Sequence, residues 1–328
     1  MNIYDIAEKC GVSIATVSRV LNNNPNVSAA TRARVLAVME EENYTPSALA
    51  RGLGTGSMRM VGVLCTTLRN PYYADALAYV ETHLRQRGLH LLLRCTGTDP
   101  QENRQALQYM LQNHVEAILL IGATIPTEED DRTLAEAARQ VPVILLDGHV
   151  DLPGVYCVSG DHKGAMMELV GLLVRRQRRR ILLLHDAMTY SCRQKIEGYT
   201  DAYAAYGLTA DPELIVAVDS DLDAVNTCIK RLLVNRVTFD AVIGTEDVLA
   251  LGAQKALQRT GLSMPIIGFN NSLPARCATP ELTSVDGNLE ALCHTAIRIL
   301  DDLLEQRPVT DHAPIPTQLV ERGTFRNN

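Results

Sequence analysis

Short apolar runs alternate with longer amphipathic stretches from residue 60 onward, and this alternation limits the fold more than any other feature of the sequence. The expected strands form two series, at residues 61–66, 89–95, 116–122, 142–147 and 155–159, and then at residues 180–185, 213–218, 240–245 and 265–270. The expected helices lie at residues 72–87, 101–113, 162–176, 192–206, 221–234, 247–260 and 288–305. Short apolar strands that alternate with helices are typical of parallel sheets covered on both faces. The pattern therefore predicts an α/β core of two doubly wound parallel-sheet subdomains.

The ends of these strands indicate where a ligand would bind. Doubly wound sheets bind ligands outside the carboxyl ends of their strands, which here places the site in the cleft between the two subdomains. A tyrosine ring at such a strand end can stack on the face of a sugar or a base. The candidate effector-binding residues are Tyr72, Tyr73, Asp147, Thr189, Tyr190, Arg193, Glu246 and Asn270. Arg193 is the strongest single candidate; a helix cap or a core partner is the alternative role of each of the others, and a cap is the role expected for Asp247.

The first 45 residues follow a different pattern, which predicts a small all-α head. Gly11 ends the first helix, and Ser13 and Ser28 are the expected caps of the second and third helices. The apolar residues at helical spacing are Ile3, Ile6, Ala7 and Cys10, then Ile14, Val17, Val20 and Leu21, and finally Val35, Leu36 and Met39. A small Ala7 lets two helices approach closely, and Gly11 tolerates a left-handed turn between them. These features predict a helix-turn-helix.

The outer side of the second helix carries groups that suit contact with DNA. Arg19 can form a bidentate contact with a guanine edge, worth ~1–3 kcal/mol of discrimination. Ile14 and Ala15 have no hydrogen-bonding side-chain group and suit apolar contact with a thymine methyl group. The short polar side chains suited to phosphate contacts are Ser13, Thr16, Ser18, Asn22, Ser28 and Thr31. The helix spacing alone leaves a second interpretation open, a three-helix protein-interaction module with a solvated polar face.

The charge distribution separates the head from the core. The whole chain has a formal net charge of −7, which by itself argues against nucleic acid. Residues 1–60 carry six basic and five acidic side chains, and residues 9–34 carry only basic ones. The remaining chain carries 25 basic and 33 acidic side chains. A basic head on an acidic body fits a protein that binds DNA through the head.

Other classes of protein find little support in the sequence. The eight cysteines are scattered without a C-x-x-C pair, and neither they nor the eight histidines have metal-ligand spacing. We expect reduced thiols, no metal site and no cofactor. No apolar stretch is long enough for a membrane span, and the N-terminus lacks a signal core, so a cytoplasmic location is expected. No P-loop or G-x-S-x-G motif points to an enzyme.

Several segments together carry a resemblance to a known family. The head contains DIAEKCGVSIATVSRVLN, followed by VSAATRARV and YTPSALARGL. The core contains NPYYADAL, DVLALGA, IIGFNN, PELTSVD and LVERGT. These segments resemble the lactose/galactose-repressor family of bacterial transcription regulators over essentially the whole chain. The resemblance favours DNA binding over the interaction-module interpretation of the head.

The resemblance implies specific roles for residues of the head and of the segment that follows it. Ile14, Ala15 and Arg19 would read the major groove. The residues implied to hold the DNA backbone are Tyr4, Ser13, Thr16, Ser18, Asn22, Ser28 and Thr31. Residues 46–53 match a hinge helix that is too short to be stable alone and that pairs with its partner in the minor groove. Ala50 would lie in that groove, and Leu53 would wedge between central base pairs.

The resemblance also implies a core like that of periplasmic sugar-binding proteins, with three crossings between the lobes near residues 158–161, 286–289 and 317–320. The expected domains are a head at residues 1–45, a hinge helix and linker at 46–59, and an effector-binding core at 60–328. Within that core, the N-subdomain is expected at about 60–158 and 289–317, and the C-subdomain at about 161–286 and 320–328. Positions 147, 189, 193, 246 and 270 match places where sugar-binding members contact their ligands. Many members carry Asp where this chain has Asn270, and Asn or Gly where it has Glu246, and Glu246 favours a neutral, amino-bearing or cationic effector over a phosphorylated one.

The implied function is that of a transcriptional repressor. We expect a homodimer that binds double-stranded operator DNA and whose affinity is controlled by a small sugar-like effector in the cleft. The chain has no leucine heptad tail, so no helical-bundle tetramer is expected. A catabolite-control-type regulator, whose core is controlled by a partner phosphocarrier protein, is the alternative.

Overall fold

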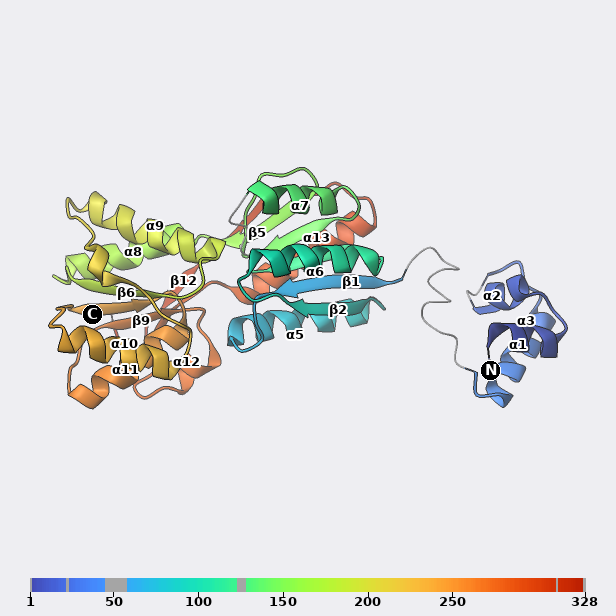
Figure 1. Cartoon of the computed structure of the whole chain (residues 1–328), viewed down its shortest axis with the longest axis horizontal. Coiled ribbons are helices and arrows are strands. Elements are labelled where there is room, and N and C mark those ends of the chain that lie inside the picture. The colour runs from blue at the N-terminus through green and yellow to red at the C-terminus, as the bar shows by residue number, and fades with distance from the viewer. Residues whose placement is uncertain (1, 22–23, 45–57, 123–127, 311, 327–328) are drawn as a thin grey trace.

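The computed structural model describes residues 2–21, 24–44, 58–122, 128–310 and 312–326. A head of three helices precedes a core of two lobes, each built around one sheet (Figure 1). The expected hinge helix at residues 46–53, with Ala50 and Leu53, lies outside the described residues, as does Asn22.

The head contains α1 (Ile3–Cys10), α2 (Ile14–Leu21) and α3 (Ala29–Glu41). Gly11 ends α1 with a φ of 62°, a left-handed conformation that glycine adopts without a steric penalty. The Ser13 hydroxyl accepts a hydrogen bond from the Thr16 backbone N–H at 3.2 Å. The Ser28 hydroxyl accepts one from the Thr31 N–H at the same distance. The two expected serine caps are therefore present, and they fix where α2 and α3 begin.

The three helices of the head enclose a small apolar core. Its fully buried side chains are Ile6, Val17 and Val35, one from each helix. Met39 also belongs to this core, as expected. The expectation that Leu36 closes the core is wrong, because that side chain is 49% exposed. Positions 35 and 39 are four apart and share one face of α3, whereas position 36 is turned about 100° away around the helix.

The first lobe is a six-stranded parallel sheet of order β11-β5-β4-β3-β1-β2. Its strands are β1 (Met60–Cys65), β2 (His90–Cys95), β3 (Ala117–Ile121), β4 (Val143–Leu146), β5 (Val155–Gly160) and β11 (His312–Ile315). Its helices are α5 (Pro71–Gln86), α6 (Pro100–Gln112), α7 (Glu128–Ala138) and α13 (Leu289–Leu304). α5 and α13 pack on one face of the sheet, and α6 and α7 pack on the other.

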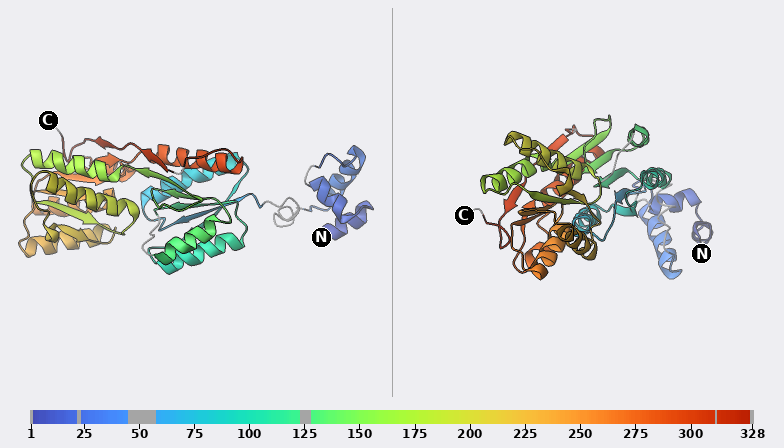
Figure 2. Two further views of the ribbon diagram at one scale, coloured as in Figure 1. Left: turned by 90° about the horizontal axis from the view of Figure 1, so that it is seen from above. Right: turned by 60° about the vertical axis from the view of Figure 1, so that its left-hand side comes forward.

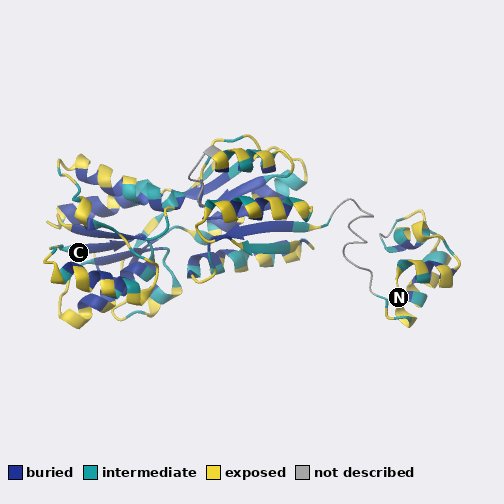
Figure 3. Ribbon diagram, viewed as in Figure 1, coloured by how far each residue is buried: buried dark blue, intermediate teal, exposed yellow. Residues whose placement is uncertain are grey.

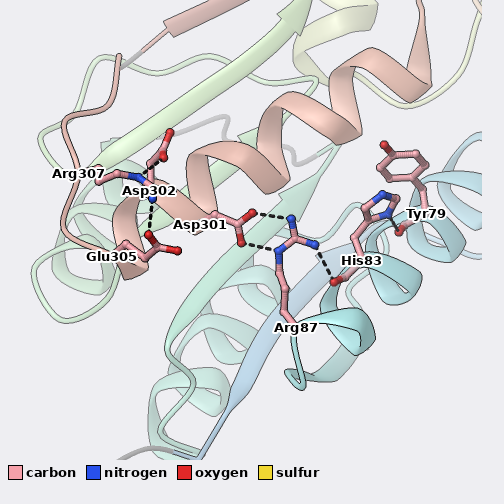
Figure 4. Close-up of polar contacts among 7 residues, drawn as sticks. All are labelled: Tyr79, His83, Arg87, Asp301, Asp302, Glu305 and Arg307. Carbon is pink, nitrogen blue, oxygen red and sulfur yellow. Dashed lines mark hydrogen bonds and ion pairs between the residues drawn. The ribbon is translucent and has the colours of Figure 1, made fainter.

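The C-terminal ends of α5 and α13 are joined by an ion pair. The Arg87 guanidinium donates two hydrogen bonds to the two carboxylate oxygens of Asp301, each at 2.5 Å. Arg87 also donates to the backbone carbonyl of His83 at 3.0 Å, and the His83 ring stacks on Tyr79 (Figure 4). Bidentate pairs of this kind have a well-defined geometry, so the pair holds two helices that lie far apart in the sequence side by side.

The second lobe is a six-stranded sheet of order β12-β10-β9-β8-β6-β7. Its strands are β6 (Ile181–His185), β7 (Ile215–Ala217), β8 (Ala241–Gly244), β9 (Ile266–Phe269), β10 (Thr283–Asp286) and β12 (Gln318–Val320). Its helices are α8 (His162–Arg175), α9 (Tyr190–Ala205), α10 (Leu222–Val234), α11 (Asp247–Thr260) and α12 (Leu273–Cys277). α8 and α9 cover one face and α10 and α11 the other (Figure 2), so the central strands β6, β8 and β9 are buried between them (Figure 3).

The expectation of two α/β subdomains with parallel sheets is confirmed, with one difference in the second sheet. There β12 pairs with β10 in the antiparallel direction, at the edge of an otherwise parallel sheet. The sequence analysis did not identify α7, α12, β10, β11 or β12. β10 to β12 are only three or four residues long, and α7 begins with four acidic residues, so none of these segments has a clear apolar period.

The chain passes between the two lobes three times within the described residues. The passages lie between β5 and α8, between β10 and α13, and between β11 and β12. The last passage comes at residues 316–317, slightly before the expected 317–320, because Gln318–Val320 already form β12. Three connecting segments let the lobes move relative to each other while they remain aligned.

Candidate functional site

The two lobes meet where strands of both sheets end. Asn70 follows β1 in the first lobe, and Glu246 follows β8 in the second. The Asn70 side-chain amide donates a hydrogen bond to the Glu246 carboxylate, so a direct polar contact joins the lobes here, in addition to the contact between Asp147 and His162. The amide oxygen of Asn70 also accepts a hydrogen bond from the Tyr72 N–H at 3.0 Å and caps α5. The position of Asn70 is therefore fixed by its own helix, and Glu246 is brought to it by the approach of the lobes.

A cavity of about 310 Å³ lies beside this contact. It is lined from both lobes, by Thr66, Thr67, Arg69, Asn70, Tyr73, Gly97, Thr98, Asp186, Ala187, Ser220 and Val248. A second cavity of about 590 Å³ shares Thr98, Asp186, Ala187 and Ser220 with the first. The first volume falls at the lower end of the range of about 300–1,000 Å³ typical of small-molecule pockets.

Asp147 stands at the end of β4 at the centre of a buried polar cluster. The Tyr72 hydroxyl donates a hydrogen bond to one carboxylate oxygen at 3.1 Å, and His162 Nε2 lies 2.5 Å from the other. All three side chains are buried. Burial alone would raise the pKa of Asp147, but the charge and hydrogen bond of His162 outweigh it and lower this pKa to about 2. Asp147 is therefore an anion at neutral pH.

Tyr73 lies in α5 and is buried near polar groups of both lobes, among them Thr66 of the first lobe and Glu246 of the second. Burial raises the pKa of Tyr73, and the nearby Glu246 carboxylate raises it further. The ring packs against Gly122, where a Cβ atom would lie 2.5 Å from the ring carbon Cε1. Gly122 also has a φ of 63°, so glycine is required there for two independent reasons. Tyr73 thus remains neutral, with its ring held by the end of β3.

Three further charged groups of the second lobe, Asp186, Lys195 and Glu246, form the other side of the site. Burial raises the pKa of Glu246 to about 8, and the neighbouring Asp186 carboxylate adds to this effect. Burial also raises the pKa of Asp186, although Lys195 acts in the opposite direction. Lys195 is 2% exposed, donates a hydrogen bond to the Thr245 carbonyl at 2.9 Å and lies 4.7 Å from the centre of the Phe269 ring.

The sequence analysis missed three members of this site, namely His162, Asp186 and Lys195. Asp186 directly follows the expected strand at residues 180–185, so the rule that selected the other candidates also points to it. Lys195 lies two positions after Arg193 in the same helix, and only the packing of α9 shows which of the two faces inward. His162 begins α8 just after a passage between lobes, and no sequence signal brings it to Asp147.

The structure does not bring all predicted effector residues together. Thr189 caps α9 by accepting a hydrogen bond from the Cys192 N–H at 3.3 Å. The Arg193 guanidinium donates to the Met188 carbonyl at 2.9 Å. Arg193 and Tyr190 line a separate cavity of about 200 Å³, together with Leu120, Asp131, Leu145, Gly148, His149 and Val150. Tyr72, Tyr73, Asp147 and Glu246 form the group described above.

Asn270 and Asp247 differ in how their side chains are engaged. Asn270 follows Phe269 at the end of β9, has a φ of 97° and is half-buried. Among the described residues its side chain has no hydrogen-bond partner. The Asp247 carboxylate accepts hydrogen bonds from the Ser284 hydroxyl at 2.6 Å and from the Ser272 N–H at 2.7 Å. Asp247 therefore ties α11 to a neighbouring loop and strand, instead of capping its own helix as expected.

The predicted DNA-contacting side of the head is accessible. Tyr4 is 65% exposed and Ile14 is 39% exposed, so both side chains are open to contact with a partner. Ser13, Ala15, Arg19 and Ser28 are exposed, and Thr16, Ser18 and Thr31 are half-buried. Val17 and Val20, on the opposite side of α2, are buried. The head thus presents the first turns of α2 to the outside.

Two further findings concern the described part of the chain. No group of three or more His, Cys, Asp or Glu residues there could hold a metal ion. None of the helices there is long and apolar enough to cross a membrane.

A three-helix head with an accessible second helix, followed by a two-lobed α/β core with a polar cleft, defines a DNA-binding regulator with an effector-binding core. The family model "Bacterial regulatory proteins, lacI family" matches residues 2–47. The model "Periplasmic binding proteins and sugar binding domain of LacI family" matches residues 58–298. The chain belongs to the LacI family of DNA-binding transcriptional regulators, which is a family of non-enzymatic proteins.

Similar proteins cover the chain from end to end. An HTH-type transcriptional regulator of Lachnoclostridium phytofermentans is 38% identical over 99% of both chains. The structure of a lac repressor dimer bound to operator and the anti-inducer ONPF matches with a TM-score of 0.83 and 24% identity, over 99% of this chain and 98% of that one. A CelR–cellobiose complex matches with a TM-score of 0.70 and 24% identity, over 99% of this chain and all of that one. At these identities the two structures establish the fold.

Proposed function

We propose that this regulator is a repressor that binds a palindromic operator as a homodimer, and that a small sugar-like effector in the cleft controls its affinity for DNA. The observation that carries the effector part is the polar cluster between the lobes. Asp147, Glu246, Asp186 and Lys195 converge there from strand ends and from α9, next to a cavity of about 310 Å³. Groups of both lobes would bind one ligand, so binding would change how the lobes are arranged.

On the DNA side, we propose that Ile14, Ala15 and Arg19 read base edges in the major groove. The proposed backbone contacts are Tyr4, Ser13, Thr16, Ser18, Asn22, Ser28 and Thr31. Exposure of Arg19 and Ile14 on the outer side of α2 supports this division. Residues 46–53, including Ala50 and Leu53, would act in the minor groove as the family resemblance implies.

On the effector side, we propose that Tyr73, Asp147, Glu246 and Asn270 act together with Asp186 and Lys195. Asn270 is included because it follows Phe269, whose ring lies against the Lys195 ammonium. Tyr72 would act through Asp147, to which it donates a hydrogen bond. Thr189 would fix the start of α9, while Tyr190 and Arg193 would bind a ligand only if it reached the cavity of about 200 Å³.

The control of DNA binding would follow from linkage between the two sites. An effector that prefers one arrangement of the lobes changes operator affinity, and the operator must change effector affinity by the same factor. The lobes are joined by the Asn70–Glu246 hydrogen bond, the Asp147–His162 contact and three chain passages, so a ligand in the cleft acts directly on their arrangement.

The proposal is tested by combining operator selection with calorimetry. A palindromic sequence is selected from a random DNA library, and its affinity is measured with and without each member of a sugar panel. A sugar that binds in the calorimeter and changes operator affinity supports the proposal. A dimer that ignores every small molecule, yet changes its operator affinity when a phosphocarrier protein is added, would favour the catabolite-control alternative.

A further inference from the structure

The cleft holds one carboxyl group more than its cations balance. The Asp147 carboxylate has its own partners, because the Tyr72 hydroxyl and His162 both bind it. Asp186 and Glu246 remain, with Lys195 as the buried ammonium group beside both and the His185 imidazole beside Asp186. Lys195 forms no ion pair within 4.0 Å among the described residues, and its one hydrogen bond goes to the Thr245 carbonyl. In the described part of the chain, the Lys195 ammonium group is thus the one positive charge available to both carboxyl groups, and it forms an ion pair with neither of them within 4.0 Å.

Burial makes this imbalance costly. A carboxylate that is removed from water must be paired, or it takes up a proton. Glu246 takes up a proton, because burial and the Asp186 carboxylate raise its pKa to about 8. Asn70 supplies Glu246 with one hydrogen-bond donor, which is a neutral group. At neutral pH the site therefore holds a proton in a place that a second cation could fill.

Two buried polar atoms next to the cluster have no hydrogen-bond partner among the described residues. Thr245, directly before Glu246, is 1% exposed, and its hydroxyl has no hydrogen-bond partner among the described residues. His162, which binds Asp147, is 4% exposed, and its Nδ1 atom also has no partner there. Buried polar atoms without partners are rare in folded proteins. The polar groups around the cluster are therefore not all satisfied by the described residues.

We propose that the effector is a polyhydroxylated amine, a sugar in which an ammonium group stands in place of one hydroxyl, and that this ammonium group binds between Asp186 and Glu246. This inference rests on the proposed function of the cleft and specifies its ligand. The ammonium group supplies the charge that Lys195 alone does not provide. The remaining hydroxyl groups face the cavity that Asn70 and Tyr73 line from the first lobe.

An anionic ligand is the opposing chemistry, because two arginines border the cavities. Arg69 lines the cavity of about 310 Å³ and Arg231 the cavity of about 590 Å³, and both side chains are exposed. Exposed arginines are solvated and need no ligand to balance them. Asp186 and Glu246 are half-buried, so water compensates their charge less well than that of the exposed arginines, and they decide the preference.

Binding of the ammonium group displaces the proton from Glu246. The groups that face Glu246 are Asn70, Tyr73, Asp186, Lys195 and Asp247. Tyr73 stays neutral because burial raises its pKa, so it does not take up the released proton. Binding at neutral pH should therefore release up to one proton into the buffer for each site.

The experiment compares ligands that differ in one substituent. Calorimetry at pH 7 is run with glucose, glucosamine, N-acetylglucosamine, 6-amino-6-deoxyglucose and glucose 6-phosphate, each in two buffers with different ionisation enthalpies. We expect one of the two aminated sugars to bind about ten- to a hundredfold more tightly than its neutral counterpart, with a heat that depends on the buffer. Glu246→Gln keeps an oxygen that can accept from Asn70, and it should abolish both the preference and the proton release. Asp219→Asn, an exposed carboxylate of the larger cavity, should change neither.

The outcomes separate this inference from the function on which it rests. If a neutral sugar or glucose 6-phosphate binds at least as tightly as the aminated sugars, or if neither aminated sugar binds, the amine proposal is overturned. If such a neutral or phosphorylated sugar also changes operator affinity, the proposed function of the cleft stands without the amine. If the panel leaves operator affinity unchanged and a phosphocarrier protein changes it, both proposals fail.

Discussion

Asn70 and Glu246 are 176 positions apart in the sequence and are joined by a hydrogen bond across the cleft. Asn70 belongs to the first lobe and also caps α5, whereas Glu246 stands before α11 in the second lobe. The arrangement of the lobes is thus coupled to a carboxyl group whose pKa is raised to about 8 by burial and by the neighbouring Asp186. A ligand that binds Glu246 acts on this contact directly.

Asn70→Asp should open the cleft in a pH-dependent way. The new carboxylate still accepts the Tyr72 N–H bond that caps α5, but it faces Glu246 with a second negative charge. Small-angle scattering should show a larger radius of gyration at pH 9 than at pH 6 in this variant. Asn70→Ser also keeps a cap but adds no charge, and its radius should not depend on pH. Equal radii for Asn70→Asp at both pH values would contradict the role of this contact.

Lys195→Met should abolish the effector response and leave operator binding intact. Methionine fills a similar space beside Phe269 but removes the one buried cation near Asp186 and Glu246. Arg193→Ala is the matched control in the same helix, because Arg193 binds the Met188 carbonyl and lines a different cavity. Operator affinity with and without effector distinguishes them. A normal response in Lys195→Met, or its loss in Arg193→Ala alone, would mean that the site lies around Arg193.

Glu246→Gln should flatten the pH dependence of core stability. The pKa of Glu246 is about 8 in the folded protein against 4.5 for an unperturbed glutamate, so the folded state binds more protons between these values. Its contribution is therefore fully present below about pH 4.5 and is lost as pH rises through about 8, with a slope approaching about 1.4 kcal/mol per pH unit. Urea unfolding from pH 5 to pH 8.5 measures this slope. Identical slopes in wild type and variant would argue against a buried, protonated Glu246.

Gly122→Ala should destabilise the first lobe by about 1–3 kcal/mol. The added Cβ atom would overlap the Tyr73 ring, and the left-handed backbone at this position is strained for any side chain. Thermal unfolding measures the loss. Gly97→Ala is a useful comparison, because Gly97 has a similar φ of 61° but open space around it. A loss at Gly122 no larger than at Gly97 would show that the Tyr73 ring moves freely.

Arg19→Ala should relax base preference at one position of each operator half-site, at a cost of about 1–3 kcal/mol. Arg19 is exposed on the outer side of α2, and no ion pair among the described residues occupies it. Arg34→Ala, an exposed cation of α3, should instead weaken binding to all sequences alike. Selection from a random DNA library, repeated for each variant, measures both the base preference at each position and the overall affinity. An unchanged selected sequence for Arg19→Ala would remove Arg19 from base recognition.

The sequence predicted most of the fold because strong local patterns agree with the final packing. The three helices of the head and nine of the strands follow from apolar period and capping residues such as Ser13 and Ser28. The elements that were missed owe their structure to their neighbours. β12, for example, is three residues long and exists because β10 pairs with it.

The cleft could be predicted only in part. Strand ends identified Asp147 and Glu246, because the carboxyl ends of parallel strands meet at one edge of each sheet. The choice between Arg193 and Lys195 depends on how α9 is rotated on the sheet, and two positions on one helix differ by about 200° in direction. His162 reaches Asp147 only because the chain has just passed between the lobes. Such contacts arise from tertiary structure and leave no local signal.

The most direct test of the whole account is operator affinity measured by fluorescence anisotropy, with wild type and Lys195→Met compared in the presence and absence of the compound that binds the cleft. The account predicts that the compound shifts operator affinity of the wild type severalfold or more and leaves that of the variant unchanged. An equal shift in both proteins would contradict it. So would a wild type whose operator affinity does not change when the compound binds the cleft.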